Sequence, residues 1–599
     1  MKGIAIGFSA NSKSLLVRLL KTEFVHEVYI ASKQIKNKKE LGVSSSKLKK
    51  ILRNSWKEVD LIIFVGSLSA SVRLISSLLI SKDKDPGVIV MDKNCSKIIP
   101  LIGLHQSNTE NIAHQMSNLF DAEVITTNNS KNNELFSIDE FGSYWGWKKS
   151  GSVNDWSKLV ISQSRNQQIY FKQTSGNKIW REANLSANIS EINLEEVSNF
   201  SATTFHISSS NTYKNTWHPP ILWIGIGCER NTSKELIKYA IDDSLSSSKL
   251  SELSIAGFAT IELKRDEKAI LEIVEEKILP IKFYSPEELS IIKVPNPSNV
   301  VFQEMGTASV AEAACLIAAG EGGKLIKTKK IYKKEGLGAV TISIAESINQ
   351  YAPHKGEIHI IGSGPGDLAF LTGDSRKALT KCSIWIGYKF YLDLLEPIRR
   401  NDQIRIDSKL TEEQIRCEKA IKLAEEGVKV AIISSGDAGI YGMAGLILEI
   451  INESKNIFKP SVEVHPGISS FQLAASIAGA PLMNDFCVVS LSDKLTPWEI
   501  IETRIEGALR GDFVVAILNP KSAERNWQLE KIINLFLNVR EVNTPVLIAR
   551  QVGRENQSKK FATLSTIPFD EIDMFTLIII GNSKTKLLGD TLVTLRGYL

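Results

Sequence analysis

The chain has 599 residues, a net charge of +5, and a composition of 43% apolar and 23% charged side chains. This length exceeds what a single hydrophobic core supports, and the composition excludes the disordered and fibrous classes, so we expect three or four globular domains. The small positive charge gives no reason to expect a nucleic-acid partner.

Cysteine usage and hydropathy indicate the compartment and the kinds of site to expect. The six cysteines form no Cys-x-x-Cys pair, so the sequence indicates neither a zinc site nor a disulfide framework. No apolar run reaches the ~18 residues of a membrane span, and the first residues lack the apolar stretch of a signal peptide. We therefore expect a cytoplasmic protein with no metal and no membrane partner.

Residues 1–127 alternate apolar strands with amphipathic helices, which is typical of βαβ units around a largely parallel sheet. The strands are expected at residues 4–8, 61–65, 88–91 and 123–125. The segment is therefore predicted to form one α/β domain.

The amino-acid composition changes in residues 128–218, where polar runs lie near both ends of the segment. Five of the ten tryptophans nevertheless fall here: Trp145, Trp147, Trp156, Trp180 and Trp217. Disordered chains lack aromatic side chains, so we expect this segment to fold. We predict a small, irregular insertion domain.

A second α/β unit is expected over residues 219–345. Its first strand, at residues 221–224, runs into a glycine-rich turn that contains Cys228. A linker follows, in which Pro353 and Gly356 break regular structure. The rest of the chain, residues 357–599, forms the last unit, so the whole chain is predicted to be a multidomain α/β protein.

The last unit contains four turns that each follow a predicted apolar strand. They lie at residues 362–367 (Gly-Ser-Gly-Pro-Gly-Asp), 434–442 (Ser-Ser-Gly-Asp-Ala-Gly-Ile-Tyr-Gly), 465–470 (His-Pro-Gly-Ile-Ser-Ser) and 518–520 (Leu-Asn-Pro). An α/β sheet opens its ligand crevice at the carboxyl ends of its strands. The first turn departs from the dinucleotide fingerprint, because Asp367 stands where the third glycine belongs, and no P-loop motif is present.

Two of these turns carry polar groups suited to a ligand. Asp437 follows a buried strand, where a carboxylate can bind ribose hydroxyls or an amine, and the small neighbours let a ligand approach the backbone. The alternative for Asp437 is a helix N-cap. In the third turn, either Ser469 or Ser470 is expected to cap the small-residue helix that follows.

Together the four turns resemble the tetrapyrrole (corrin/porphyrin) methyltransferase family. Residues 434–443 and 519–522 are most similar to its precorrin-3B C-17-methyltransferase branch, also called the cobalt-factor III methyltransferases. The resemblance covers residues 357–599 and implies two α/β subdomains with S-adenosyl-L-methionine held between them. It implies that the cofactor is surrounded by Pro365, Ser435, Gly436, Asp437, Ile440, Tyr441, Ser469, Ser470 and Asn519.

The resemblance also implies a carboxylate-rich tetrapyrrole substrate, methylated at carbon 17 with contraction of the ring, and a homodimer formed through this domain. A sulfonium is already a strong electrophile, so the protein mainly has to orient the two reactants, which is worth roughly 7–11 kcal/mol. Arg416, Lys494, Lys521 and Arg525 are candidate anchors for the substrate carboxylates. The alternative for each is a solvated surface side chain.

Residues 1–127 and 219–345 resemble the two parts of the cobalt-precorrin-5A hydrolases, which open the lactone left by ring contraction and release acetaldehyde. The N-terminal likeness rests on residues 64–66, Arg73, 85–92 and 100–105, and the C-terminal likeness on residues 225–228, 259–264, 294–298 and 306–314.

This second resemblance implies that His105 is the acid or base at the lactone and that Arg73 steadies a carboxylate or oxyanion. The glycines that the family places after this histidine are missing here, which narrows the pocket if they provide room. The alternative for His105 is a hydrogen-bonded loop histidine.

Cys228 is expected to be a small buried residue rather than a nucleophile, and Thr307 and Ser309 either cap a helix or line a cleft.

Two hypotheses follow from these resemblances. The first is a bifunctional cobalamin-biosynthetic enzyme that combines an S-adenosylmethionine-dependent methyltransferase with a lactone hydrolase. The second keeps the methyltransferase and makes residues 1–345 a non-catalytic tetrapyrrole-binding or assembly module. A methyltransferase that acts on an unrelated small molecule is a third interpretation.

Overall fold

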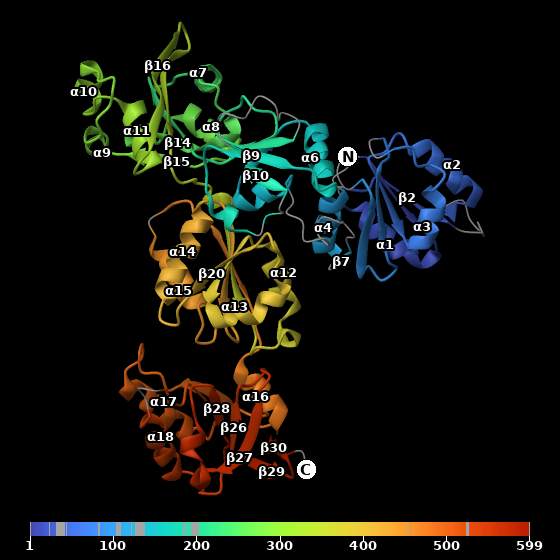
Figure 1. The fold of residues 1–599 in the computed structure, drawn as a ribbon, viewed down its shortest axis with the longest axis vertical. Coiled ribbons are helices and arrows are strands. Elements are labelled where there is room, and N and C mark those ends of the chain that lie inside the picture. Colours follow the sequence, from blue (N-terminus) through green and yellow to red (C-terminus); the bar gives the residue numbers. More distant parts are fainter. Residues whose placement is uncertain are drawn as a thin grey trace. The chain divides into compact units, whose positions relative to one another are not determined.

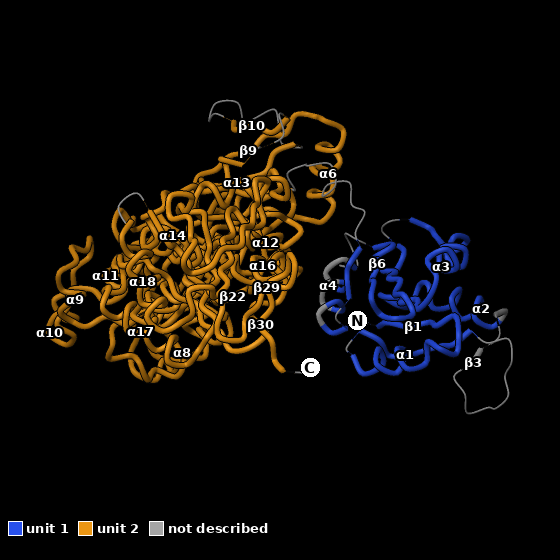
Figure 2. Tube along the Cα trace, turned by 90° about the horizontal axis from the view of Figure 1, so that it is seen from below, with its two compact units in different colours: residues 1–133 blue, residues 134–599 orange. Residues whose placement is uncertain are grey.

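The computed structural model describes residues 2–22, 24–31, 42–43, 45–81, 84–103, 109–120, 122–125, 138–183, 185, 188–192, 203–454, 456–522 and 526–597. The chain divides into two compact units, residues 1–133 and residues 134–599 (Figure 2). Helices and sheets alternate through most of the chain (Figure 1), which confirms the predicted multidomain α/β class.

The first unit is built around a sheet whose described strands run in the order β3-β2-β1-β4-β5-β6-β7. Neighbouring strands are parallel, apart from β5 and β6. The strands are β1 Gly3–Gly7, β2 Glu27–Ala31, β3 Gly42–Val43, β4 Leu61–Val65, β5 Gly87–Met91, β6 Lys97–Ile102 and β7 Glu123–Val124. The helices are α1 Lys13–Leu20, α2 Ser45–Ser55, α3 Leu68–Ile75 and α4 Thr109–Phe120. Separate apolar clusters on the two faces of the sheet explain why β1, β4 and β5 are apolar throughout.

The second unit begins with a sheet in the tryptophan-rich segment, in the order β10-β9-β11-β12-β8. Its strands are β8 Lys148–Ser150, β9 Ile169–Gln173, β10 Ile189–Glu191, β11 Thr204–Ile207 and β12 Thr216–His218, and helix α6 spans Val153–Ser164. The segment is thus more regular than the sequence indicated. Its strands are too short to show a clear alternation of apolar and polar residues, so they could not be recognised in the sequence. All five tryptophans are buried, and most contact other aromatic rings.

A mixed sheet follows in the order β15-β14-β13-β17-β16, with β17 antiparallel to both of its neighbours. The strands are β13 Leu222–Cys228, β14 Ile255–Ile261, β15 Ile281–Tyr284, β16 Lys324–Lys334 and β17 Gly338–Glu346. The helices are α7 Lys234–Ser247, α8 Lys268–Lys277, α9 Pro286–Ser290, α10 Asn299–Met305 and α11 Val310–Ala319.

The last 240 or so positions form two subdomains. The first is a parallel sheet in the order β20-β19-β21-β18-β22. Its strands are β18 Glu357–Gly362, β19 Ile384–Tyr388, β20 Ile404–Ser408, β21 Lys429–Ser434 and β22 Ser461–His465. Its helices are α12 Gly373–Lys381, α13 Lys389–Leu395, α14 Glu413–Glu425 and α15 Ala444–Glu453.

The second subdomain is a mixed sheet in the order β24-β25-β28-β26-β27, beside a smaller sheet in the order β23-β30-β29. The strands are β23 Gly479–Ala480, β24 Phe486–Ser490, β25 Val514–Leu518, β26 Pro545–Arg550, β27 Ser558–Thr563, β28 Thr576–Ile580, β29 Thr585–Leu588 and β30 Thr591–Thr594. The helices are α16 Ser470–Ala478, α17 Trp498–Arg510 and α18 Gln528–Leu537. Helix α16 packs on this sheet, so residues 466–469 connect the two subdomains.

One hydrophobic core joins the tryptophan-rich segment to the first of these subdomains. Trp145, Trp147 and Trp180 share it with Ile358 and Ile360 of β18. Polar contacts follow the same boundary, where the buried amide of Gln350 accepts a hydrogen bond from Trp147 Nε1 at 2.7 Å and donates to the carbonyls of Trp145 (2.8 Å) and Glu426 (2.7 Å). The two segments therefore fold as one body.

No single helix among the described residues has both the length and the apolar composition to cross a membrane. One bent pair, α10 with α11, meets that requirement by length and composition alone.

Candidate cofactor and substrate site

Three of the four predicted turns meet because the strands that precede them are neighbours. β21, β18 and β22 lie side by side and run parallel, so the turns at residues 434–442, 362–367 and 465–470 leave the same edge of the sheet. This arrangement places the turns at the position where α/β sheets bind ligands.

The first two turns are joined directly through their backbones. Gly364 and Gly436 exchange hydrogen bonds, with N···O distances of 3.1 and 2.9 Å. Both have positive φ (74° and 64°), which a glycine adopts without strain. Gly467 of the third turn comes so close that an added Cβ would lie 2.0 Å from the carbonyl oxygen of Gly436. These glycines allow the three turns to pack with no side chain between them.

Asp437 ties the second turn to the third. One carboxylate oxygen accepts a hydrogen bond from the backbone N–H of Gly439 at 2.8 Å, and the other accepts one from Gly467 at 3.0 Å. Helix α15 begins only at Ala444, so Asp437 does not cap it. Each oxygen keeps a free lone pair, so the half-buried carboxylate can still accept a bond from a ligand.

Tyr441 and Asn519 connect these turns to the second subdomain. The Tyr441 hydroxyl donates to the carbonyl of Val488 and accepts from the N–H of Ser490, both at 3.3 Å. The Asn519 amide donates to the hydroxyl of the same Ser490 at 3.0 Å. The fourth turn thus lies against the same segment of β24 that Tyr441 contacts.

The first turn also reaches the second subdomain. Gly553 O accepts a hydrogen bond from the backbone N–H of Asp367 at 2.7 Å. Pro365 is buried against the same glycine, since a Cβ on Gly553 would lie 2.7 Å from the proline ring. All four turns therefore converge at the junction of the two subdomains.

Two residues at this junction hold strained backbone conformations. Tyr441 and Asn519 have φ values of 52° and 50°, in the left-handed region that side chains other than glycine rarely adopt. Such strain costs about 1–3 kcal/mol and is common where a ligand is clamped. Both side chains are exposed, so burial of the side chain does not explain the strain.

The remaining predicted residues lie in the same turns. Ser469 is buried at the N-cap position of α16, where its N–H bonds Gln472 Oε1 at 2.8 Å. Ser435 and Ser470 are half-buried, and Ile440 is 38% exposed. S-adenosylmethionine is a nucleoside that carries an amino acid, so it offers both polar groups and apolar surface. The turns provide hydroxyls, a carboxylate and a partly exposed apolar side chain, and these residues therefore suit S-adenosylmethionine.

The proposed carboxylate anchors have different surroundings. Arg416 is buried and donates to Glu413 (3.0 Å) and to the carbonyls of Glu412 and Lys409, so the expectation that it binds substrate is wrong. Lys521 Nζ donates to the carbonyl of Phe569 at 3.1 Å, whereas Lys494 is exposed. Arg525 lies outside the described residues.

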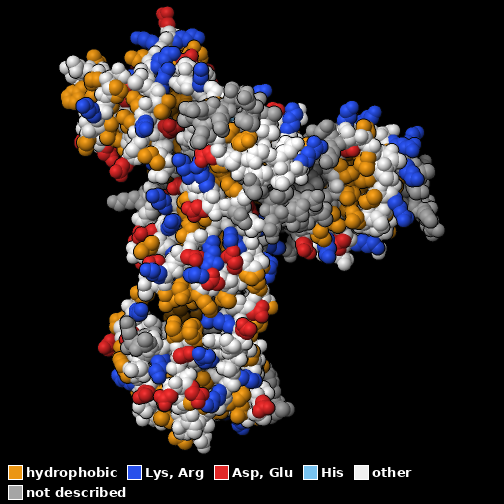
Figure 3. Space-filling view, viewed as in Figure 1, with side chains coloured by type: hydrophobic (Ala, Val, Ile, Leu, Met, Phe, Trp, Pro, Cys, Tyr) orange, Lys and Arg blue, Asp and Glu red, His pale blue; other side chains and the backbone are white. Residues whose placement is uncertain are grey.

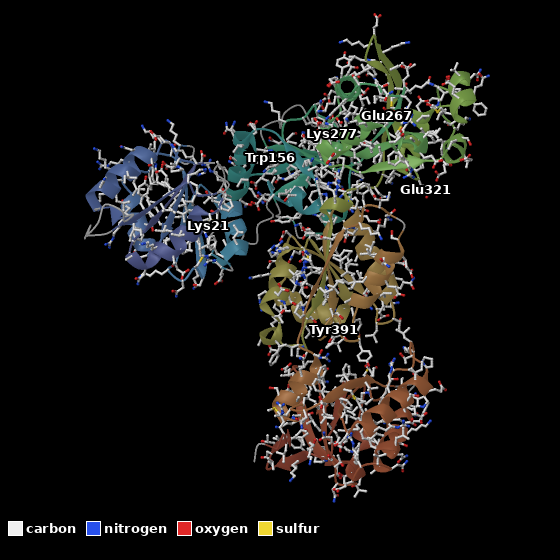
Figure 4. The ribbon with its side chains drawn as sticks, turned by 180° about the vertical axis from the view of Figure 1, so that it is seen from behind. Lys21, Trp156, Glu267, Lys277, Glu321 and Tyr391 are labelled. Atoms are coloured by element: carbon white, nitrogen blue, oxygen red, sulfur yellow. The ribbon has the colours of Figure 1, made fainter. Side chains whose placement is uncertain are left out.

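Arg554 was missed by the sequence reasoning and has the features of an anion anchor. Its Nε is buried and has no hydrogen-bond acceptor among the residues that the structure describes, and burial lowers the pKa of its guanidinium. The guanidinium lies 4.8 Å from the ring centre of Phe390 on α13. Figure 4 labels the neighbouring Tyr391, at the end of the first subdomain that faces the second, and Figure 3 shows apolar side chains gathered in a hollow there.

The two residues proposed for lactone opening are in the first unit. Arg73 is exposed on α3 and forms no ion pair with any residue that the structure describes. His105 lies outside the described residues. Their roles remain predictions.

In the C-terminal part of the hydrolase-like region, Cys228 is not set up as a nucleophile. Burial raises the pKa of its thiol to about 11, so it stays protonated at neutral pH. Ser309 stands at the N-cap of α11 without a side-chain capping bond, and the buried Thr307 hydroxyl has no partner among the described residues. Neither therefore caps the helix.

Family models match three parts of the chain. "Cobalamin synthesis G N-terminal" matches residues 50–130, "Cobalamin synthesis G C-terminus" residues 222–345, and "Tetrapyrrole (Corrin/Porphyrin) Methylases" residues 357–568. A "Probable cobalt-factor III C(17)-methyltransferase" of Salmonella typhimurium is 42% identical over 241 residues, which are 40% of this chain and 99% of that protein. The chain belongs to the tetrapyrrole methylase family. It is a fusion of both cobalamin synthesis G parts with a methylase of the C17 branch, and the cofactor of such a methylase is S-adenosylmethionine.

Two further comparisons concern the same part of the chain. The "Cobalt-factor III methyltransferase" of Priestia megaterium is 44% identical over 246 residues, 41% of this chain, but the chain spans only 45% of that relative. The solved structure of the methyltransferase CobJ is 31% identical, with a TM-score of 0.38, over 40% of this chain and all of CobJ.

Proposed function

We propose that residues 357–599 methylate carbon 17 of precorrin-3B or cobalt-factor III, with contraction of the ring. The observation that carries this proposal is the convergence of the four turns at the junction between two subdomains. Two relatives that match this region, at 42% and 37% identity, carry the C17 activity in their names.

In this proposal the chain mainly binds the cofactor and the tetrapyrrole and orients them toward each other. S-adenosylmethionine supplies the electrophilic methyl group when it is bound. Asp437 accepts a hydrogen bond from the cofactor, Tyr441 and Asn519 fix the separation of the two subdomains, and Arg554 binds a carboxylate of the tetrapyrrole. Water is excluded by the apolar side chains of the hollow between the subdomains.

Methyl transfer is tested with the full chain, S-adenosylmethionine and each candidate substrate under anaerobic conditions. Mass spectrometry should show one added methyl group, and NMR of labelled product should place it on carbon 17. Arg554→Lys should raise KM for the tetrapyrrole more than for the cofactor. Transfer to another carbon, or no transfer to either substrate, would contradict the proposal.

We further propose that the two cobalamin synthesis G parts open the lactone of cobalt-precorrin-5A with release of acetaldehyde, through His105 and Arg73. The support is the match of both parts on one chain with a methylase of the same pathway. Full-length protein should release acetaldehyde from the lactone, and His105→Ala and Arg73→Ala should each lower that rate while methyl transfer continues.

The second hypothesis makes residues 1–345 a module that binds the tetrapyrrole without chemistry. The missing glycines after His105 favour it. Tight binding of the lactone substrate with no release of acetaldehyde would select this hypothesis over the hydrolase.

Homodimer formation through the methylase domain is also a proposal, and size-exclusion chromatography with light scattering tests it.

A further inference from the structure

Three side chains meet on one face of the β18–β22 pair, next to the point where the third turn begins. His359 lies opposite Glu463 in the parallel register, and His465 is two residues further along β22. Residues two apart on a strand share a face, so the ring nitrogens of both histidines and the carboxylate of Glu463 point to the same place. His359 and His465 are buried, whereas the Glu463 side chain is 56% exposed.

A carboxylate behind each histidine fixes which ring nitrogen carries the proton. His359 Nε2 lies 2.9 Å from Glu357 Oε2, and His465 Nδ1 lies 2.6 Å from Asp374 Oδ2. A carboxylate only accepts hydrogen bonds, so each of these nitrogens must be the N–H donor. The other nitrogen of each neutral ring, His359 Nδ1 and His465 Nε2, therefore presents a lone pair.

These two lone pairs face each other across 3.0 Å. Glu463 Oε2 completes a triangle, at 3.6 Å from His359 Nδ1 and 3.7 Å from His465 Nε2. Three acceptor atoms this close repel one another unless a cation lies between them. Two cations can do so: a proton shared by the two rings, or a metal ion bound by all three atoms.

The size of the triangle fits a metal ion. Bonds of about 2.0–2.2 Å in a tetrahedral arrangement place neighbouring ligand atoms about 3.3–3.5 Å apart, which lies between the observed edges. Two imidazoles and one carboxylate suit Zn²⁺ and similar first-row ions better than Mg²⁺ or Ca²⁺, which prefer oxygen. Hydrogen bonds from the non-ligating ring nitrogens to carboxylates are the usual support of metal-binding histidines.

We propose that His359, Glu463 and His465 bind one divalent first-row transition metal ion of the Zn²⁺ type, with Glu357 and Asp374 orienting the two histidines. The exposed side of Glu463 leaves a fourth position for water. This site is separate from the proposed methyl-transfer chemistry, and it differs from the metal-free protein that the cysteine pattern indicated.

The position of the site indicates what the ion does. β22 is the edge strand of its sheet, and its described side chains are mostly exposed. The ion would clamp β22 to β18 close to the ends from which the third and first turns leave. It would therefore fix the relative position of Gly362 and Gly467, which lie close together where the first and third turns meet.

The test is the metal content and metal affinity of the untagged full-length protein. After removal of metals with a chelator and titration with Zn²⁺, we expect one tightly bound ion per chain and a raised melting temperature. Co²⁺ should bind at the same place with the visible d–d absorption of a four-coordinate ion and without a thiolate charge-transfer band. His359→Gln and His465→Gln should abolish this stoichiometric binding.

Two exposed positions keep the test informative if the buried histidine variants fail to fold. Glu463→Gln should raise the Kd for Zn²⁺ at least 10-fold, and Asp374→Asn should raise it roughly 10–100-fold. His26→Gln, at a surface histidine of the first unit, should change nothing. Absence of stoichiometric binding to the wild type, or binding unaffected by both Glu463→Gln and Asp374→Asn, would overturn the proposal and leave a shared proton as the cation.

Discussion

The carboxylate of Asp437 accepts a hydrogen bond from the backbone N–H of Gly467 across 3.0 Å, which joins two turns that are 30 residues apart in sequence. A hydrogen bond to a charged group contributes about 1.5–3 kcal/mol. Asp437 therefore organises the turns, and in the proposed function it also binds the cofactor.

We expect Asp437→Ala to weaken S-adenosylmethionine binding by roughly 10-fold or more, because it removes both the ligand contact and the link to the third turn. Isothermal titration of the full-length protein measures this change. Asp590→Ala, at an exposed aspartate in the turn between β29 and β30, is the matched control and should leave the affinity unchanged. Equal affinities in wild type and Asp437→Ala would contradict the placement of the cofactor.

The close approach of the turns can be tested through a single methyl group. Gly467→Ala would place a Cβ 2.0 Å from the carbonyl oxygen of Gly436, and backbone must shift to relieve this overlap. We expect a loss of about 2–3 kcal/mol in unfolding free energy, together with weaker cofactor binding. Gly445→Ala is the control, since that exposed glycine of α15 has nothing near its added Cβ. It should be neutral or stabilising by up to about 1 kcal/mol.

The sequence was sufficient for the features that depend on local patterns. The apolar run at residues 61–65 predicted β4 at its observed bounds, and the apolar strands expected before the second and fourth turns are β21 and β25. The glycine-rich turns after the strands pointed to a site that the structure brings together. The contacts of Arg416 and Arg554 depend instead on tertiary packing, so the sequence alone put forward Arg416, which is buried and paired, and gave no reason to consider Arg554. Likewise His359 and His465 are 106 residues apart and meet only through strand register.

Acid should destabilise the second unit through His218. This buried ring contacts Ser150 Oγ and the carbonyl of Ser208, both at 2.8 Å, and burial lowers its pKa from 6.5 to about 4. Below pH 6.5 the unfolded chain takes up a proton that the folded chain does not, so stability is fully present above pH 6.5 and falls as pH is lowered toward 4. His206, with the same shift, adds to this loss.

Thermal melting between pH 7.5 and pH 4.5 measures this dependence. The melting temperature of wild type should fall across that range, and His218→Gln should show a smaller fall because it cannot take up the proton. An identical pH profile for the variant would show that His218 is not a source of the acid sensitivity.

The side-chain amide of Gln350 makes several of the buried hydrogen bonds at the contact between the tryptophan-rich segment and the methylase. Gln350→Ala would leave Trp147 Nε1 and two buried carbonyls without their partner, at a cost of about 1–3 kcal/mol for each unsatisfied group. We expect a total loss of roughly 3 kcal/mol or more in urea unfolding followed by tryptophan fluorescence. Asn349→Ala, at the exposed neighbouring position, should stay within about 0.5 kcal/mol of wild type.

The core shared by Trp145, Trp147, Ile358 and Ile360 affects how this protein can be dissected. A fragment starting at Glu357 would expose to water a surface of β18 that is buried in the intact chain. It should therefore aggregate, even though its relatives include a protein of about the same length as this region. Cutting near residue 133, between the compact units, leaves that surface covered. The parts of this fusion are therefore more than tethered, because side chains of the tryptophan-rich segment complete the core of the methylase sheet.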